Sequence, residues 1–248
     1  MTARSKNDPS TRLSRAKSRG SGQTGVGALS AVLLLLGACS NQAPTPQPVA
    51  TPTTQAPRPP AGPQRLIVAF GDSLYAGYGL KPGESWPAGI EKALWARGIN
   101  AKVVNAGVSG DTTAAARTRL AFVLDAQPTK PDLVAVGLGG NDMLRGLPPA
   151  QARANIDAIL TELDKRKIPA LLTGMLAAPN LGAEYARDFN AIFPALAKQH
   201  NAALVPFFLQ PVVGKPELIQ DDHVHPTAKG IALIVADTVD VVAGVLPR

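Results

Sequence analysis

The sequence has a single cysteine, Cys39, among its 248 residues, so the chain cannot form an intramolecular disulfide. It also lacks a glycine-rich dinucleotide fingerprint, a phosphate-binding P-loop and any tight cluster of potential metal ligands. No internal repeat is visible. We therefore expect a protein that uses neither a nucleotide cofactor nor a metal ion and that is not a repeat protein.

The excess of basic residues is concentrated near the start of the chain. The whole sequence has 25 Lys and Arg against 18 Asp and Glu, and residues 1–38 hold six of those basic residues and one of the acidic ones. The rest of the chain has a net charge of only +2. The high overall charge is therefore no evidence for a nucleic-acid partner.

Residues 1–38 have the parts of a secretory signal peptide. A basic segment is followed by the apolar run Val26–Leu36 and then by the small residues Gly37 and Ala38. This apolar run is too short to remain in a bilayer as a spanning helix. We expect the segment to direct export and to be removed.

The sequence Leu36-Gly37-Ala38-Cys39 resembles the bacterial lipobox, in which the cysteine is lipidated and becomes the first mature residue. The alternative is an ordinary signal peptide that happens to contain a cysteine. An unpaired thiol in an exported protein needs a reason, and lipidation of Cys39 supplies one. The resemblance implies a membrane-anchored lipoprotein facing the periplasm or the cell exterior. By resemblance to enterobacterial sorting rules, Ser40 in place of Asp favours the outer membrane.

The segment that follows has the composition of a tether. Eight of the 24 residues in 41–64 are proline, and most of the others are Ala, Thr and Gln, so this stretch cannot form a core. We assign residues 39–64 to the lipidated cysteine and its tether, and residues 65–248 to one folded domain, which we expect to be a monomer.

The domain alternates apolar, strand-like runs with amphipathic helical stretches. Pro149 and Pro226 suit the first turn of a helix, and Gly98 suits a helix end. The pattern predicts a three-layer α/β/α sandwich around a five-stranded parallel sheet. The expected strands are 66–70, 101–105, 133–138, 170–175 and 203–206, and the expected helices are 85–97, 112–124, 149–166, 183–200 and 227–245.

Three of the predicted strands are followed by glycine and small polar residues, and a fourth motif lies near the C-terminus. Serine, histidine and carboxylate are the parts of a nucleophilic hydrolase, and they need to meet in space rather than in sequence. The carboxyl ends of parallel strands share one edge of the sheet, so these loops can meet. The motifs are Gly71-Asp72-Ser73-Leu74, Ser109-Gly110-Asp111-Thr112, Gly139-Gly140-Asn141-Asp142 and Asp222-His223-Val224-His225-Pro226.

These four blocks, in this order, identify residues 66–247 as similar to SGNH hydrolases of the GDSL esterase family. Within it, the chain resembles the bacterial arylesterase, thioesterase I and lysophospholipase group. The resemblance implies a flavodoxin-like fold and a carboxylic ester hydrolase that acts on acyl-ester, thioester or lipid substrates through an acyl-enzyme. Two rival functions remain, a carbohydrate or peptidoglycan O-acetylesterase and a non-catalytic envelope-binding lipoprotein.

The resemblance also assigns roles to single residues. Ser73 is the expected nucleophile, His225 its base, and Asp222 the carboxylate that orients His225. The expected oxyanion-hole donors are the backbone N–H groups of Ser73 and Gly110 and the side-chain amide of Asn141.

Other polar residues in these blocks are possible competitors. Asp72 is either a second catalytic carboxylate or a turn cap, and we favour the cap. Asp221 and His223 compete with Asp222 and His225, but the three-residue spacing and the His-Pro pair favour the latter two. We expect a loop brace at Asp111 and Asp142 and a solvated helix end at His200. The segment 176–182, which lines the acyl site in the resembled group, is either a mobile lid or a stiff turn.

Overall fold

The structure, a computed structural model, describes residues 58–247. The expected signal peptide (1–38), Cys39 and most of the expected tether (39–64) lie outside the described residues, so they remain predictions. Within residues 58–247, no helix is both long enough and apolar enough to cross a membrane.

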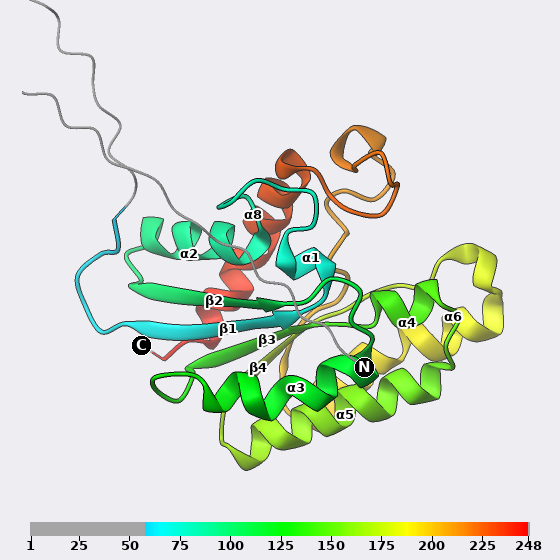
Figure 1. Cartoon of the computed structure of the whole chain (residues 1–248), viewed down its shortest axis with the longest axis horizontal. Helices are drawn as coiled ribbons and strands as arrows, with labels where there is room; N and C mark the ends of the chain where they lie inside the picture. The colour runs from blue at the N-terminus through cyan, green and yellow to red at the C-terminus, as the bar shows by residue number, and fades with distance from the viewer. Residues whose placement is uncertain (1–57, 248) are drawn as a thin grey trace, which may run out of the picture. The chain divides into compact units, whose positions relative to one another are not determined.

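Five parallel strands form one sheet in the order β2-β1-β3-β4-β5, which confirms the expected sheet (Figure 1). The chain builds outward from β1 in both directions, so the crevice between the ends of β1 and β3 is the switch point at which open α/β sheets bind ligands. The strands are β1 (Arg65–Gly71), β2 (Ala101–Gly107), β3 (Leu133–Gly137), β4 (Ala170–Thr173) and β5 (Ala203–Val205).

Helices cover both faces of the sheet, as expected for an α/β/α sandwich. On one face, α2 (Trp86–Ala96) packs against α8 (Ala228–Val245). On the other face, α3 (Thr113–Asp125) packs against α5 (Pro149–Lys165), and α7 (Ile192–Gln199) lies beside α5.

The structure differs from the predicted helices in a few places. One helix was expected over 183–200, but the chain forms α6 (Ala183–Asn190) and α7, which meet at Ala191. Pro194 explains the break, because it has no N–H to donate to the carbonyl of Asn190. Pro226 lies just before Thr227, the N-cap of α8, rather than in its first turn. The short helices α1 (Ser73–Ala76), α4 (Gly140–Leu144), η1 (Pro179–Leu181) and η2 (Pro216–Leu218) were not expected.

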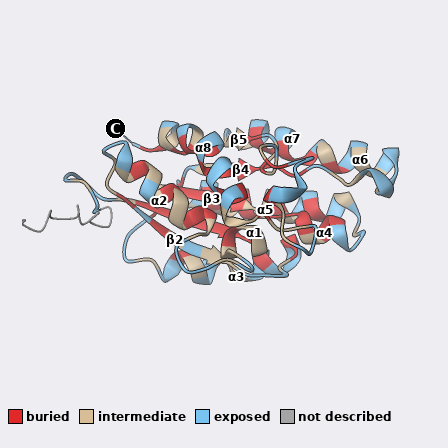
Figure 2. Ribbon diagram, turned by 90° about the horizontal axis from the view of Figure 1, so that it is seen from above, coloured by how far each residue is buried: buried red, intermediate tan, exposed pale blue. Residues whose placement is uncertain are grey.

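The core lies between the sheet and the two helical layers, and Figure 2 shows buried residues running along the strands. Tyr75, Trp86 and Phe208 form an aromatic cluster behind α1, with the rings of Tyr75 and Trp86 stacked 4.5 Å apart. Both polar ends are satisfied, because Tyr75 pairs with Thr173 and the Trp86 indole donates to Thr238, each at 2.9 Å. This aromatic cluster supports α1, the segment that follows β1.

Candidate active site

Three strands end level with one another at the edge that carries the motifs. Gly71 at the end of β1 pairs in register with Gly107 at the end of β2 and with Gly137 at the end of β3. The segments carrying Ser73, Gly110 and Asn141 therefore leave the sheet side by side, and the structure brings together the residues predicted for the site.

Ser73, His225 and Asp222 form a continuous chain of hydrogen bonds. Ser73 Oγ lies 2.7 Å from His225 Nε2, and His225 Nδ1 lies 2.6 Å from Asp222 Oδ2. Because an ionised carboxylate only accepts, Nδ1 carries the proton and Nε2 is left to accept from the serine hydroxyl. This is the arrangement that a serine nucleophile and its base require.

Asp222 is held in its ionised form. Its other oxygen, Oδ1, accepts from the N–H groups of Val224 (2.9 Å) and His225 (3.0 Å). Burial alone would raise the pKa of Asp222, but these two N–H groups and the ring of His225 lower it to about 2. Asp222 is therefore a carboxylate throughout the pH range in which such a site works.

The loop before α8 is tied to the segment after β1. The side chain of Gln220 donates to the carbonyl of Tyr78 and to that of Pro226, each at 2.9 Å, and the Tyr78 ring lies 4.6 Å from the His225 ring. His223 is exposed, has a φ of 61° and lines the cleft, but Ser73 Oγ is hydrogen-bonded to His225 instead.

Gly110 and Asn141, two of the expected oxyanion donors, lie in segments that leave the sheet beside the segment of Ser73. Gly110 has a φ of 86°, which L-residues with a side chain rarely adopt, so the turn at its N–H depends on glycine. Its carbonyl accepts from Arg145 Nη2 at 2.8 Å, which ties the Gly110 loop to α4. Asn141 lies in α4, and its Nδ2 donates to Asp72 Oδ2 at 3.4 Å.

Asp72 is the N-cap of α1, as the sequence favoured. Its Oδ1 accepts from the N–H of Leu74 at 3.0 Å, and the residue is only 2% exposed. Burial raises its pKa to about 6, against the opposing effects of the Leu74 N–H and the Asn141 amide. Asp72 makes no hydrogen bond to Ser73 Oγ or to His225, so the structure does not indicate a second catalytic carboxylate.

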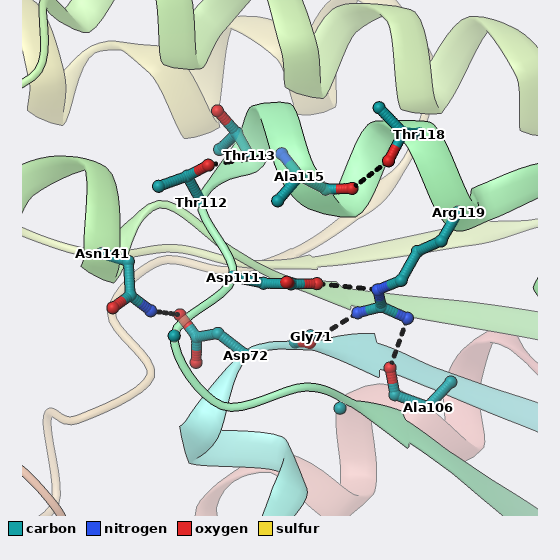
Figure 3. Close-up of polar contacts among 12 residues, drawn as sticks. Gly71, Asp72, Ala106, Asp111, Thr112, Thr113, Ala115, Thr118, Arg119 and Asn141 are labelled. Carbon is teal, nitrogen blue, oxygen red and sulfur yellow. Dashed lines mark hydrogen bonds and ion pairs between the residues drawn. The ribbon is translucent and has the colours of Figure 1, made fainter. Parts of the chain in front are cut away.

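Arg119, which the sequence analysis missed, braces the edge of the sheet (Figure 3). Its guanidinium donates to Asp111 (2.7 Å), to the carbonyl of Ala106 (2.8 Å) and to the carbonyl of Gly71 (3.0 Å). It also stacks 4.3 Å from the Phe70 ring centroid. Its position next to Leu120, on the buried side of α3, was the signal that could have found it.

The contacts also decide between the expected and observed environments of two further residues, Asp142 and His200. Asp142 is a brace, as expected: it accepts from the Thr113 hydroxyl (2.6 Å) and N–H (2.8 Å) and so joins α4 to α3. His200 is not a solvated helix end. It caps α7, but only 7% of its side chain is exposed, because the ring is held by Asp164 (2.6 Å) and Asp157 (2.8 Å) of α5.

A cleft of about 230 Å³ opens beside Ser73 and is lined mostly by apolar side chains. The segment 176–182 contributes Ala178, and its backbone is anchored where the N–H of Ala177 donates to Asn190 at 2.8 Å. Within the part of the chain that the structure describes, no group of three or more His, Cys, Asp or Glu could hold a metal ion. The apolar lining residues are Leu74, Met143, Leu144, Met175, Ala178, Leu209 and Val224.

Comparison with known proteins places this site in context. Residues 69–233 match the model of the GDSL-like Lipase/Acylhydrolase family. The chain is 40% identical over 166 residues to "Esterase TesA" of Pseudomonas aeruginosa, a match that covers 67% of this chain and 81% of the relative. It is 39% identical over 163 residues to an arylesterase of Vibrio mimicus, with 66% and 80% covered. A solved SGNH-hydrolase family esterase, AlinE4, is 60% identical with a TM-score of 0.65, and the match covers 76% of this chain and 100% of AlinE4.

Proposed function

The chain belongs to the GDSL-like lipase/acylhydrolase family and is a carboxylic ester hydrolase, and we propose that Ser73, His225 and Asp222 carry out its reaction. The observation that carries this proposal is the unbroken line of hydrogen bonds from Ser73 Oγ through His225 to Asp222. Variants of AlinE4 with one serine or one aspartate changed to alanine have been solved, and these two positions have the same separation as Ser73 and Asp222.

The reaction proceeds in two acyl transfers. Ser73 Oγ attacks the carbonyl carbon of the ester or thioester while its proton moves to His225 Nε2. When the tetrahedral intermediate collapses, the bond to the leaving group breaks and His225 protonates that group. A water molecule, deprotonated by His225, then attacks the acyl-serine; the bond between the carbonyl carbon and Ser73 Oγ breaks, His225 returns the proton to Oγ, and the acid is released. Asp222 holds His225 in the required tautomer and stabilises its charged form.

The negative oxygen of each tetrahedral intermediate needs hydrogen-bond donors that are already in place. We assign this role to the N–H groups of Ser73 and Gly110 and to Nδ2 of Asn141. The in-register ends of β1, β2 and β3 support the assignment, because they place the three segments next to one another.

We propose acyl chains longer than acetyl as the preferred substrates. The apolar lining beside Ser73 supports this, since buried methylene groups contribute roughly 0.8 kcal/mol each. The names of the relatives, arylesterase and thioesterase 1/protease 1/lysophospholipase L1, agree with broad specificity for acyl esters and thioesters. Polar partners for a sugar ring do not dominate this lining.

A series of p-nitrophenyl esters from acetate to palmitate tests the proposal, with Ser73→Ala as the inactive reference. We expect kcat/KM to rise beyond acetate and then to fall when the chain outgrows the cleft. Activity on acetate alone would favour an O-acetylesterase of envelope glycans. Absence of hydrolysis of every ester would favour a non-catalytic envelope-binding protein.

We also propose that the protein is exported, lipidated at Cys39 and anchored in the outer membrane, with the catalytic domain acting as a monomer. The support comes from the sequence alone: a basic and then apolar leader, the Leu-Gly-Ala-Cys lipobox, and a proline-rich segment directly after it.

A further inference from the structure

Asp72 is a buried carboxylate whose two oxygens have different partners. Oδ1 accepts from the N–H of Leu74 at 3.0 Å and so caps α1, whereas Oδ2 accepts from Nδ2 of Asn141 at 3.4 Å. Helix capping accounts for the hydrogen bond of Oδ1 but not for that of Oδ2. The second is directed across the crevice between β1 and β3, at the residue that we assign to the oxyanion hole (Figure 3).

The contact matters because an asparagine side chain has two nearly isosteric ends of opposite character. The oxygen end accepts hydrogen bonds and the nitrogen end donates two. Only the nitrogen end can stabilise an oxyanion, and a carboxylate, which only accepts, favours the orientation that turns Nδ2 toward it. One N–H of Asn141 then binds Asp72, and its other N–H is left for the substrate.

We propose that Asp72 is a positioning residue that holds Nδ2 of Asn141 toward the oxyanion, an inference that rests on the proposed oxyanion role of Asn141. Gly140, at the start of α4, lies close to this contact, since a Cβ built there would be 3.4 Å from Asp72 Oδ2. Asp72 thus links the segment that carries the nucleophile to the helix that carries the third donor.

Keeping this carboxylate ionised is unfavourable for the fold. Burial raises the pKa of Asp72 to about 6, and nearby Asp111 acts in the same direction, while the Leu74 N–H, the Asn141 amide and His225 oppose it. The pKa in the folded state is above the ordinary value of 3.8, so the folded state gains protons as the pH falls, and stability is lowest above about pH 6. A purely structural cap would not need a charge here, because asparagine caps helices as well as aspartate does.

The variant Asp72→Asn separates the two roles. Its side-chain oxygen can still cap α1 at Leu74, but its nitrogen then faces Nδ2 of Asn141, donor against donor. Asn141 is expected to turn over and to present its oxygen to the oxyanion. A matched control is Asp142→Asn, the same substitution at the residue that follows Asn141. There the Thr113 hydroxyl can accept from the new amide.

The test measures kcat, KM and Tm with a p-nitrophenyl ester for the wild type, Asp72→Asn, Asn141→Ala and the double variant. We expect each single variant to lower kcat by about 10²-fold or more with little change in KM. The double variant should be no slower than Asn141→Ala. The Tm of Asp72→Asn should equal or exceed that of the wild type at pH 8, with a smaller difference at pH 5. Asp142→Asn should stay within about threefold of the wild-type kcat.

The remaining outcomes overturn the inference in distinguishable ways. Normal kcat in Asp72→Asn together with a slow Asn141→Ala would make Asp72 a cap only, and would leave the proposed function intact. Loss of kcat in parallel with Tm, or a double variant slowed by the product of the two single effects, would show that Asp72 acts by another route. Normal kcat in Asn141→Ala would remove the oxyanion role of Asn141 and with it the positioning role of Asp72, but not the proposed roles of Ser73, His225 and Asp222.

Discussion

Of the two histidines in the short loop before α8, only His225 is hydrogen-bonded to Ser73, the proposed nucleophile. His225 Nε2 is 2.7 Å from Ser73 Oγ, while His223 is an exposed residue of the cleft lining. The difference arises because Asp222 accepts hydrogen bonds from both the backbone N–H and the ring Nδ1–H of His225 and so fixes the direction of the ring. The local turn from Asp222 to His225, rather than the presence of a histidine in the loop, therefore determines which histidine can act as the proposed base.

We predict that His225→Ala lowers kcat by about 10³-fold or more, since no other group is placed to take the proton of Ser73. The matched variant His223→Ala should keep kcat within about threefold, with at most a change in KM. Steady-state kinetics on one ester measures both. The opposite ranking would assign the base to His223.

The motifs that contain Ser73, Gly110, Asn141 and His225 could be recognised because each is short and lies next to a predictable element. The contacts of Arg119 and Arg145 could not be predicted, because their acceptors lie on other segments: the carbonyls of Gly71 and Ala106 for one, and that of Gly110 for the other. Such contacts follow from the register of the strands, which the sequence does not state.

Among the secondary-structure elements, the segment from β4 to α6 controls one side of the cleft. Met175 and Ala178 line the cleft, and the N–H of Ala177 is held by Asn190, the last residue of α6. The N–H of Ala178 also contacts Met143 Sδ at 3.2 Å. The wall against which an acyl chain packs is thus tied to α6 and α4.

We predict that Asn190→Ala weakens binding of long acyl chains and spares short ones. Loss of one backbone anchor should raise KM for the laurate ester by about threefold to tenfold, while the acetate ester changes little. Gln199→Ala, on α7 and away from the cleft, is the control. An equal effect on both esters would mean that this segment does not contact the acyl chain.

The junction of α5 and α7 contains a histidine held between two carboxylates. Burial lowers the pKa of His200, but Asp164 and Asp157 outweigh it, so its pKa is raised above the ordinary 6.5. Stability from this cluster is therefore fully present below about pH 6.5 and is lost as the pH rises through the higher pKa of the folded state.

We predict that His200→Gln lowers Tm more at pH 6 than at pH 9, without a change in kcat. Thermal unfolding at both pH values, with His223→Gln as the control, measures this. A Tm loss that is independent of pH would indicate that the ring contributes by packing alone. The sequence could not reveal this cluster, because Asp157 and Asp164 belong to another helix.

For the protein as a whole, the sheet and its layers were predictable and one helix break was misread. The strands are short apolar runs between glycine and polar residues, a local signal, and all five were found. The break at Ala191 also had a local signal in Pro194, but the amphipathic pattern continues across it and hid the change of direction.

We predict that Cys39→Ser prevents lipidation and membrane association but leaves kcat unchanged. The described residues form the sheet and the complete candidate site without Cys39, and 76% of this chain covers the whole of AlinE4. Cell fractionation and intact-mass analysis of the mature protein give the answer. An unlipidated wild-type protein that begins at another residue would contradict the anchoring proposal and leave the esterase unaffected.

The most direct measurement of the central claim is covalent labelling of the nucleophile. A phosphonate ester should react once per chain, and peptide mass spectrometry should locate the adduct on Ser73, with loss of hydrolysis in proportion to labelling. Ser73→Ala should remain folded by circular dichroism, take up no label and lack esterase activity. An adduct on another residue, or hydrolysis that persists in Ser73→Ala, would contradict the assignment of Ser73 as the nucleophile.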